Sequence, residues 1–279
     1  MKIDSQIPTY WFTIDQIKPL KMALLIVIIF MIGSCSNDHM NIEGEMLVIE
    51  DQMPVEDPVE DPVEDPVEDP VEYPVVSERV NFTYLALGDS YTIGQGVASS
   101  MRWPNQLKSR LESDSINLQE VNILARTGWT TTALLSAIAS EKPKNHDLVS
   151  LLIGVNNQYQ NYSFTSFKNE FDELLNISIA LAGETKKVFV VSIPDYGVTP
   201  FGAGFRYQPL ADEIDMYNAY IKTKCNQFDV PFIDVTRLSR QLGDSKGALA
   251  DDDLHPSGSQ YSKWVDLIYP VALELLKNP

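Results

Sequence analysis

The sequence contains few cysteines and histidines, and this limits the kinds of site that it can build. Its 279 residues include two cysteines, Cys35 and Cys225, and three histidines, His39, His146 and His255. Two cysteines in such different contexts do not make the disulfide framework of a small secreted domain. No histidine stands at metal-ligand spacing from a cysteine or another histidine, so we predict no metal site.

The sequence also lacks a basic region, and its formal net charge is −18. Between residues 36 and 79 there are fifteen acidic residues and one basic residue, Arg79, a net charge of −14. From residue 80 to the end, 22 acidic and 17 basic residues give a net charge of −5. This last part is long enough for one domain with a core, and it has no basic stripe of the kind that nucleic-acid binding needs. We therefore expect no nucleic-acid partner.

A 12-residue apolar run near the N-terminus, Met22 to Gly33, follows two lysines. It is short for a helix that must cross about 30 Å of hydrocarbon, and it predicts a signal peptide over residues 1–34. The end of this run, Ile32-Gly33-Ser34-Cys35, resembles the bacterial lipoprotein motif, in which the cysteine receives a lipid and becomes the first mature residue. The alternative is an uncleaved anchor, or a signal peptide with an incidental cysteine. Either way we expect export, and lipidation would hold the protein in the cell envelope, on the periplasmic face or the cell surface.

Residues 35–79 are predicted to be a disordered acidic linker that begins at the lipidated Cys35. Proline recurs at every fourth position from Pro54 to Pro74, mostly as Pro-Val-Glu-Asp. Proline removes backbone donors and blocks helix formation, and the repeated carboxylates repel one another. At about 3.1 Å per residue in polyproline geometry, residues 51–76 could extend roughly 80 Å. A proline-rich docking ligand is the alternative, but it needs proline at i and i+3.

The last part of the chain, residues 80–279, alternates between strand-like and helix-like segments. This order predicts a three-layer α/β/α sandwich with a parallel, flavodoxin-like sheet. The expected strands are 80–87, 116–125, 147–153, 187–193 and 230–235, and the expected helices are 100–111, 131–138, 164–181, 211–228 and 257–276. Functional residues should then lie in loops at the carboxyl ends of the strands.

Polar residues suited to nucleophilic catalysis follow several of these strands. Serine needs a base within hydrogen-bond reach, a carboxylate that orients the base, and donors for the developing oxyanion. Ser90 follows the first strand, in Gly88-Asp89-Ser90, and Asn156 follows the third. Near the C-terminus His255 follows Asp252 by three residues, so that one short segment could supply both the base and its orienting carboxylate.

Four blocks together resemble the SGNH/GDSL hydrolases, in that family's order. They are "GDS" at 88–90, the glycine of "RTGWTT" at Gly128, "GVNN" at 154–157 and "DLHP" at 253–256 with Asp252 before it. The resemblance implies that Ser90 is the nucleophile, His255 the general base and acid, and Asp252 the residue that holds the tautomer of His255. It also implies an oxyanion hole made by the backbone N–H groups of Ser90 and Gly128 and the side-chain amide of Asn156.

The sequence departs from the family pattern at Asn157, where an aspartate is common, and this puts in doubt any hydrogen bond that the acid would make. Position 92 is threonine, so the Gly-x-Ser-x-Gly elbow of α/β-hydrolases is not indicated. Several other residues are predicted to have structural roles: Asp251 and Asp253 in a solvated loop, His146 on a surface loop, and Cys225 as an unreactive helix thiol. Trp129 either lines the site or packs beside it.

The resemblance implies an exported, membrane-tethered serine ester hydrolase that acts through an acyl-enzyme without a metal or organic cofactor. Its substrate would be a carboxylic ester, either an O-acetylated glycan or a lysophospholipid-type ester. Aromatic residues at 196–208, with Tyr159 and Tyr162, could contact a sugar or an acyl chain. The alternative is a surface-displayed carbohydrate- or lipid-binding module that has this fold but little turnover.

Overall fold

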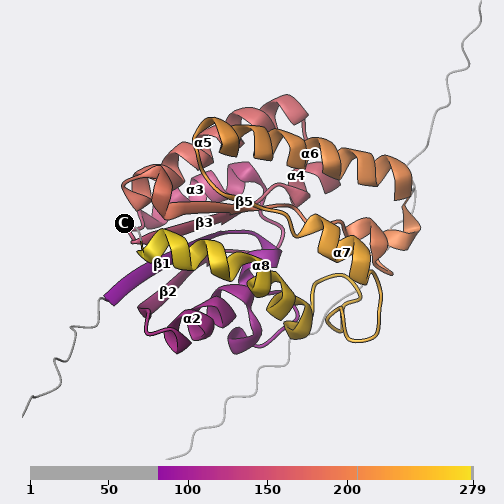
Figure 1. Cartoon of the computed structure of the whole chain (residues 1–279). Helices are drawn as coiled ribbons and strands as arrows, with labels where there is room; N and C mark the ends of the chain where they lie inside the picture. Colours follow the sequence, from indigo (N-terminus) through magenta and orange to yellow (C-terminus); the bar gives the residue numbers. More distant parts are fainter. Residues whose placement is uncertain (1–80, 206, 278–279) are drawn as a thin grey trace, which may run out of the picture. The chain divides into compact units, whose positions relative to one another are not determined.

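The computed structural model describes residues 81–205 and 207–277 (Figure 1). The predicted signal peptide, the lipidation site at Cys35 and the acidic linker lie outside the described residues. The described residues belong to the part of the chain that was expected to form the hydrolase domain.

Five parallel strands form one sheet in the order β2-β1-β3-β4-β5. They are β1 (Asn81–Gly88), β2 (Asn117–Ala125), β3 (Leu148–Leu152), β4 (Val188–Val191) and β5 (Phe232–Ile233). The chain passes from β1 to β2 on one side and then returns to β3 on the other, so the direction of winding reverses between β1 and β3. This is the flavodoxin-like order that the sequence predicted, and a crevice forms at such a reversal, outside the carboxyl ends of the strands.

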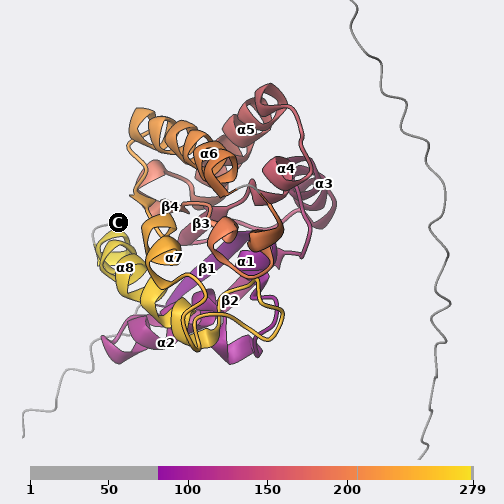
Figure 2. The ribbon, with the colours of Figure 1, turned by 90° about the vertical axis from the view of Figure 1, so that its right-hand side faces the viewer.

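Helices cover both faces of the sheet, as Figure 2 shows from the side. One face carries α2 and α8, which contact each other, and the other carries α3, α5 and α6. The main helices are α2 (Trp103–Ser113), α3 (Thr131–Glu141), α5 (Phe164–Ala182), α6 (Tyr207–Gln227), α7 (Thr236–Leu242) and α8 (Gly258–Lys277). Shorter turns are α1 (Ser90–Ile93), α4 (Val155–Tyr159), η1 (Ser99–Met101), η2 (Thr185–Lys187), η3 (Tyr196–Val198) and η4 (Gly202–Gly204). Among the described helices, none is long and apolar enough to cross a membrane.

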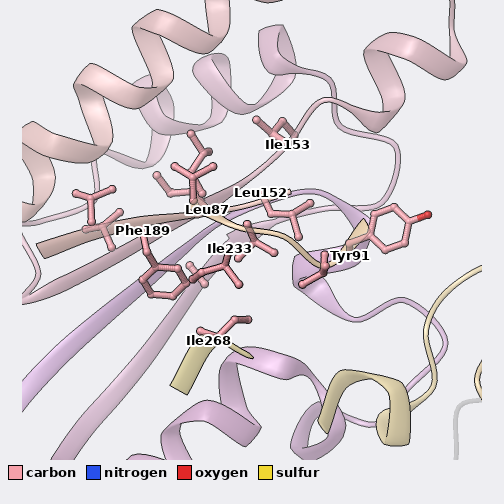
Figure 3. Close-up of a cluster of buried hydrophobic side chains, with 14 of the residues drawn as sticks. Leu87, Tyr91, Leu152, Ile153, Phe189, Ile233 and Ile268 are labelled. Atoms are coloured by element: carbon pink, nitrogen blue, oxygen red, sulfur yellow. The ribbon is translucent and has the colours of Figure 1, made fainter. Parts of the chain in front are cut away.

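The central strands are buried on both faces, which explains their largely apolar sequences. Every residue of β3 and of β4 is buried. Figure 3 shows Leu87, Leu152 and Phe189 from neighbouring strands in one cluster, with Ile268 of α8 against it. Burying one such side chain contributes roughly 1.5–3 kcal/mol, so this layer fixes the position of the strand ends on which the site is built.

The structure differs from the sequence prediction mainly at the last strand and at the start of helix α6. The fifth strand was expected over residues 230–235, but β5 has two residues and pairs only with β4. It is an edge strand, and Pro231, just before it, has no N–H to donate to a ladder. Helix α6 starts at Tyr207, four residues earlier than expected, because Pro209 lies in the first turn, where a backbone N–H has no helical partner.

Candidate active site

The reversal between β1 and β3 brings four of the predicted site residues to one pocket. Ser90, Gly128, Asn156 and His255 all line a pocket of about 140 Å³. Ser90 follows β1, Gly128 follows β2, Asn156 follows β3, and His255 precedes α8. The other residues that line the pocket are Tyr91, Thr127, Val155, Tyr159, Tyr196, Phe201 and Leu254. The fifth predicted residue, Asp252, is hydrogen-bonded to His255.

A tight turn at the end of β1 presents Ser90. A Cβ on Gly88 would come within 2.2 Å of Thr92 Oγ1 and 2.6 Å of the Leu152 carbonyl oxygen, so only glycine fits there. Asp89 then caps α1 by accepting the Tyr91 N–H at 3.0 Å. Ser90 is the first residue of this helix, and its backbone N–H therefore has no partner within the helix.

The Asp89 carboxyl group lies fully buried beside the serine. One of its oxygens, Oδ1, accepts the capping hydrogen bond, and Oδ2 has no hydrogen-bond partner among the described residues. Burial raises the pKa of Asp89 to about 7, against the lowering effect of the backbone hydrogen bond from Tyr91. The carboxyl group thus holds a proton far more readily than an exposed aspartate does.

The histidine side of the pocket is held together by hydrogen bonds within one short loop. The His255 ring nitrogen Nδ1 lies 2.7 Å from Asp252 Oδ2, and Asp252 Oδ1 accepts the backbone N–H groups of Leu254 and His255. Burial opposes the ionisation of Asp252, but these hydrogen bonds outweigh it and lower its pKa. An ionised Asp252 fixes the proton of His255 on Nδ1 and leaves Nε2 as the acceptor.

The ring of Tyr91 supports the imidazole from the side of α1. The centroids of the Tyr91 and His255 rings lie 5.4 Å apart, and Tyr91 also packs on Trp264 of α8. His255 is buried, whereas its acidic neighbours Asp251 and Asp253 are exposed, as expected for a solvated loop. The loop therefore places His255 at the pocket, with its ring hydrogen-bonded to one carboxylate, that of Asp252.

The opposite side of the pocket presents Gly128 and Asn156. Gly128 has a φ of +84°, a left-handed conformation that favours glycine, although a Cβ there would have open space. Asn156 Nδ2 donates to the Trp129 carbonyl oxygen at 2.9 Å. An amide nitrogen carries two hydrogens, so one fixes the side chain to the turn and the second remains as a donor.

Two residues left open by the sequence have clear positions. Trp129 is partly buried against the core and does not line the pocket, so it packs beside the site while its carbonyl oxygen holds Asn156. Asn157 is fully buried and makes two hydrogen bonds to Thr131 at the start of α3. The asparagine that replaces the common aspartate is therefore part of the packed structure behind the pocket.

Aromatic side chains form the remaining wall of the pocket. Tyr159, Tyr196, Phe201 and Phe205 contact one another, with ring centroids 6.0–6.4 Å apart. Of the aromatic residues singled out in the sequence, Tyr159, Tyr196 and Phe201 line the pocket, but Tyr162 does not. Val155 and Leu254 also line the pocket, and the sequence analysis did not single them out. Each lies next to a motif residue in the sequence, and this position could have identified them.

Two residues outside the pocket were also assigned roles from the sequence. The prediction that His146 lies on the surface is wrong: it is buried, with Nδ1 bonded to the Lys144 carbonyl oxygen and Nε2 to the Asn122 amide. Cys225 is buried in α6, and burial raises the pKa of its thiol to about 12, which makes it unreactive. Over the described residues, no group of three or more His, Cys, Asp or Glu side chains is placed to hold a metal ion.

The chain belongs to the GDSL-like lipase/acylhydrolase family, whose sequence profile matches residues 86–263. The matched segment includes all four blocks, and it makes the protein a hydrolase of the esterase and lipase type. No curated protein sequence matches the chain.

Several solved structures share the fold at low sequence identity. The crystal structure of TesA is 20% identical, with a TM-score of 0.54, and the alignment covers 70% of this chain and 99% of that one. The lipase Lip_vut3 from a goat rumen metagenome is 20% identical, with a TM-score of 0.56, covering 69% and 98%. The acetyl xylan esterase AlAXEase is 16% identical, with a TM-score of 0.54, covering 68% and 98%. At these identities the likeness supports the α/β fold.

Proposed function

We propose that the protein hydrolyses carboxylic esters through an acyl-enzyme on Ser90. The observation that carries this proposal is that Ser90, the Asp252-bound His255 and Asn156 meet at one pocket although they are far apart in the sequence. Ser90 Oγ attacks the ester carbonyl carbon while His255 Nε2 takes the hydroxyl proton. The same proton passes to the leaving alcohol as the carbon–oxygen bond breaks.

Water then completes the reaction. His255 takes a proton from a water molecule, the resulting nucleophile attacks the acyl carbon, and the acid leaves as the proton returns to Ser90. In both steps the negative charge on the carbonyl oxygen is stabilised by the N–H groups of Ser90 and Gly128 and by the free amide hydrogen of Asn156. The hydrogen bonds from these donors become stronger as negative charge develops on the carbonyl oxygen, so they stabilise the transition state more than the bound ester.

The pocket favours an ester with a compact acyl group. A cavity of roughly 150 Å³ holds one benzene molecule, and this pocket, at about 140 Å³, has comparable room. Tyr196 forms part of its wall, with a buried ring and a hydroxyl that donates to Gln158 Oε1 at 2.9 Å. Of the two substrate classes expected from the sequence, this size supports an acetylated glycan over a long-chain lysophospholipid, and exposed Tyr159 and Phe201 at the rim are suited to stacking on a sugar ring.

We further propose that a lipid on Cys35 and the acidic linker hold the hydrolase domain at the bacterial cell envelope. The support is in the sequence: an apolar run after two lysines, a lipoprotein-like motif, and a repeat that cannot build a core. Labelling of the intact protein with a radioactive fatty acid, lost in Cys35→Ala, would test the anchor independently of the reaction.

A fluorophosphonate probe tests the nucleophile directly. We expect covalent labelling of the purified protein at Ser90, located by mass spectrometry, and none in Ser90→Ala. A folded protein that neither reacts with the probe nor hydrolyses any ester would instead favour the alternative, a carbohydrate- or lipid-binding module with this fold.

The substrate class is tested with nitrophenyl esters of increasing chain length and with acetylated sugars. We expect kcat/KM to be highest for short acyl chains and to fall beyond about six carbons, the size that a benzene-sized cavity admits. Phe201→Ala, which removes a pocket wall, should move the optimum to longer chains. Tyr162→Ala is the matched control, because Tyr162 is an exposed aromatic residue that does not line the pocket.

A further inference from the structure

A chain of hydrogen bonds connects two of the three predicted oxyanion donors, Gly128 and Asn156, to helix α5. Asn156 and Asn157 are adjacent in α4, and they bind the turn before α3 and the first residue of α3, respectively. Asn156 holds the Trp129 carbonyl oxygen, next to Gly128, and Asn157 holds Thr131 two residues further on. The hydroxyl of Thr131 in turn donates to Glu170 Oε2 on α5. We call Thr131, Asn157 and Glu170 the oxyanion clasp.

The direction of each hydrogen bond in the clasp is fixed by chemistry. The Thr131 backbone N–H can only donate, so the Asn157 atom 3.0 Å from it is the carbonyl oxygen Oδ1. Asn157 Nδ2 then donates to Thr131 Oγ1 at 2.7 Å. A hydroxyl has a single hydrogen, and that of Thr131 goes to Glu170, whose second oxygen accepts the Thr132 hydroxyl at 2.8 Å. Every hydrogen bond in the clasp thus pairs one donor with one acceptor.

We propose that the oxyanion clasp positions Gly128 and Asn156. We also propose that Glu170 is the reason why asparagine, and not aspartate, fits at position 157. This proposal rests on the proposed function for its catalytic part, because the donors matter only if charge develops at the pocket. Asn157 and Glu170 do not line the pocket, and they act as positioning residues through residues 128–131. The carboxylate that the family commonly has at position 157 is supplied here from α5.

The clasp explains why aspartate would be unsuitable at position 157 in this protein. One oxygen of an ionised aspartate there could still accept the Thr131 N–H, but its second oxygen would face Thr131 Oγ1 as another acceptor. Thr131 would then stand between two carboxylates with one hydrogen to give, and one carboxylate would be repelled without a partner. Position 157 is fully buried, so the new charge could not be solvated.

Glutamine at position 170 would remove this conflict by reversing the chain of hydrogen bonds. Its amide nitrogen would donate to Thr131 Oγ1, and the Thr131 hydroxyl would donate to the aspartate introduced at position 157, so that each donor again has one acceptor. Glu170→Gln alone is tolerated as well, because the glutamine can turn its oxygen toward Thr131. The structure thus predicts a strong interaction between the two positions.

The test is a double-mutant cycle measured by kcat, KM and thermal unfolding. Since displacing a catalytic group by about 1 Å can cost roughly 10²-fold, we expect Asn157→Asp to lower kcat by about 10- to 100-fold with KM little changed. Glu170→Gln alone should stay within about threefold of the wild type, because all hydrogen bonds can re-form. The double variant should regain most of the lost kcat and most of the lost Tm.

Asp172→Asn provides the matched control for rescue. Asp172 also lies on α5, but it binds Tyr220 and Lys224 and does not contact Thr131. Asp172→Asn removes one negative charge from α5, as Glu170→Gln does. The kcat and Tm of Asn157→Asp combined with Asp172→Asn should therefore stay as low as those of Asn157→Asp alone. Equal rescue by both partners would show a general charge effect and overturn the clasp.

The outcomes also separate this proposal from the proposed function. Active sites are counted with the fluorophosphonate probe, so that a loss of folded protein is not mistaken for a loss of kcat. Wild-type kcat in Asn157→Asp, or no rescue by Glu170→Gln in either kcat or Tm, overturns the clasp while ester hydrolysis stands. If the wild-type protein is inert toward probe and esters, the catalytic part falls with the proposed function, and coupling in Tm alone tests the hydrogen-bond chain.

Discussion

The two sides of the pocket are built in different ways. On the histidine side, Asp252 and His255 are three residues apart, and the hydrogen bonds that hold them lie within one loop. On the oxyanion side, Asn156 and Asn157 bind a turn that lies 26 or 27 residues away in the sequence. The first arrangement is a local motif, and the second exists only once β2, β3 and α5 have packed together.

This difference separates two ways of damaging the site. A change in the histidine loop should alter the proton-transfer chemistry and leave the fold intact, since the hydrogen bonds between Asp252 and His255 lie within that loop. A change on the oxyanion side should displace donors and also weaken the packing between α3, α4 and α5. The two sides also differ in electrostatics, because the partly exposed Asp252 has a lowered pKa, while the buried Asp89, next to Ser90, has a raised one.

The largest effect is expected from Asp252→Asn on the histidine side. Asparagine cannot hold the proton of His255 on Nδ1 as a carboxylate does, and loss of the orienting acid in a serine triad costs about 10⁴-fold in kcat. Initial rates at saturating ester measure this, with Tm as the check on folding. Asp253→Asn is the control, because Asp253 is exposed and its side chain does not bond to His255; an equal loss there would refute the assignment.

A smaller effect, about 10²–10³-fold in kcat, is expected from Asn156→Ala on the oxyanion side. The amide acts mainly once charge has developed, so KM should change little. Steady-state kinetics on a short-chain nitrophenyl ester separate the two parameters. A raised KM with unchanged kcat would assign Asn156 to substrate binding instead.

Asp89→Asn should change stability and its pH dependence more than the reaction. The folded-state pKa of Asp89, about 7, lies above the ordinary value of 3.8, so the folded state binds the proton more tightly than the unfolded state. The stability that comes from proton binding by Asp89 is therefore fully present below about pH 4, and it is lost as the pH rises to about 7. Asparagine carries no charge, so the free energy of unfolding of the variant, relative to the wild type, should rise over this interval by an amount on the order of a few kcal/mol and then level off, and Tm should follow it. A constant difference from pH 4 to 8 would contradict the raised pKa.

The histidine side was predictable from the sequence because its residues lie close together in the chain. Asp252, His255 and the turn at Ser90 are short-range patterns, and the alternation of strands and helices follows from a sheet covered on both faces. The clasp was not predictable, because Glu170 lies in an amphipathic helix where a glutamate normally marks a solvated position. In the sequence, Asn157 was visible only as a departure from the family pattern. Nothing near His146 in the sequence indicated that it would be buried with hydrogen bonds to Asn122 and to the Lys144 carbonyl oxygen.

The central claim is that Ser90 attacks an ester while Gly128 and Asn156 receive the oxyanion. The most direct test is a crystal structure of the phosphonate adduct formed with the fluorophosphonate probe. We expect phosphorus bonded to Ser90 Oγ, with one phosphonate oxygen about 2.7–3.1 Å from the backbone nitrogens of Ser90 and Gly128 and from Asn156 Nδ2. Phosphorus on another residue, or a phosphonate oxygen facing solvent with these three donors unused, would contradict the account.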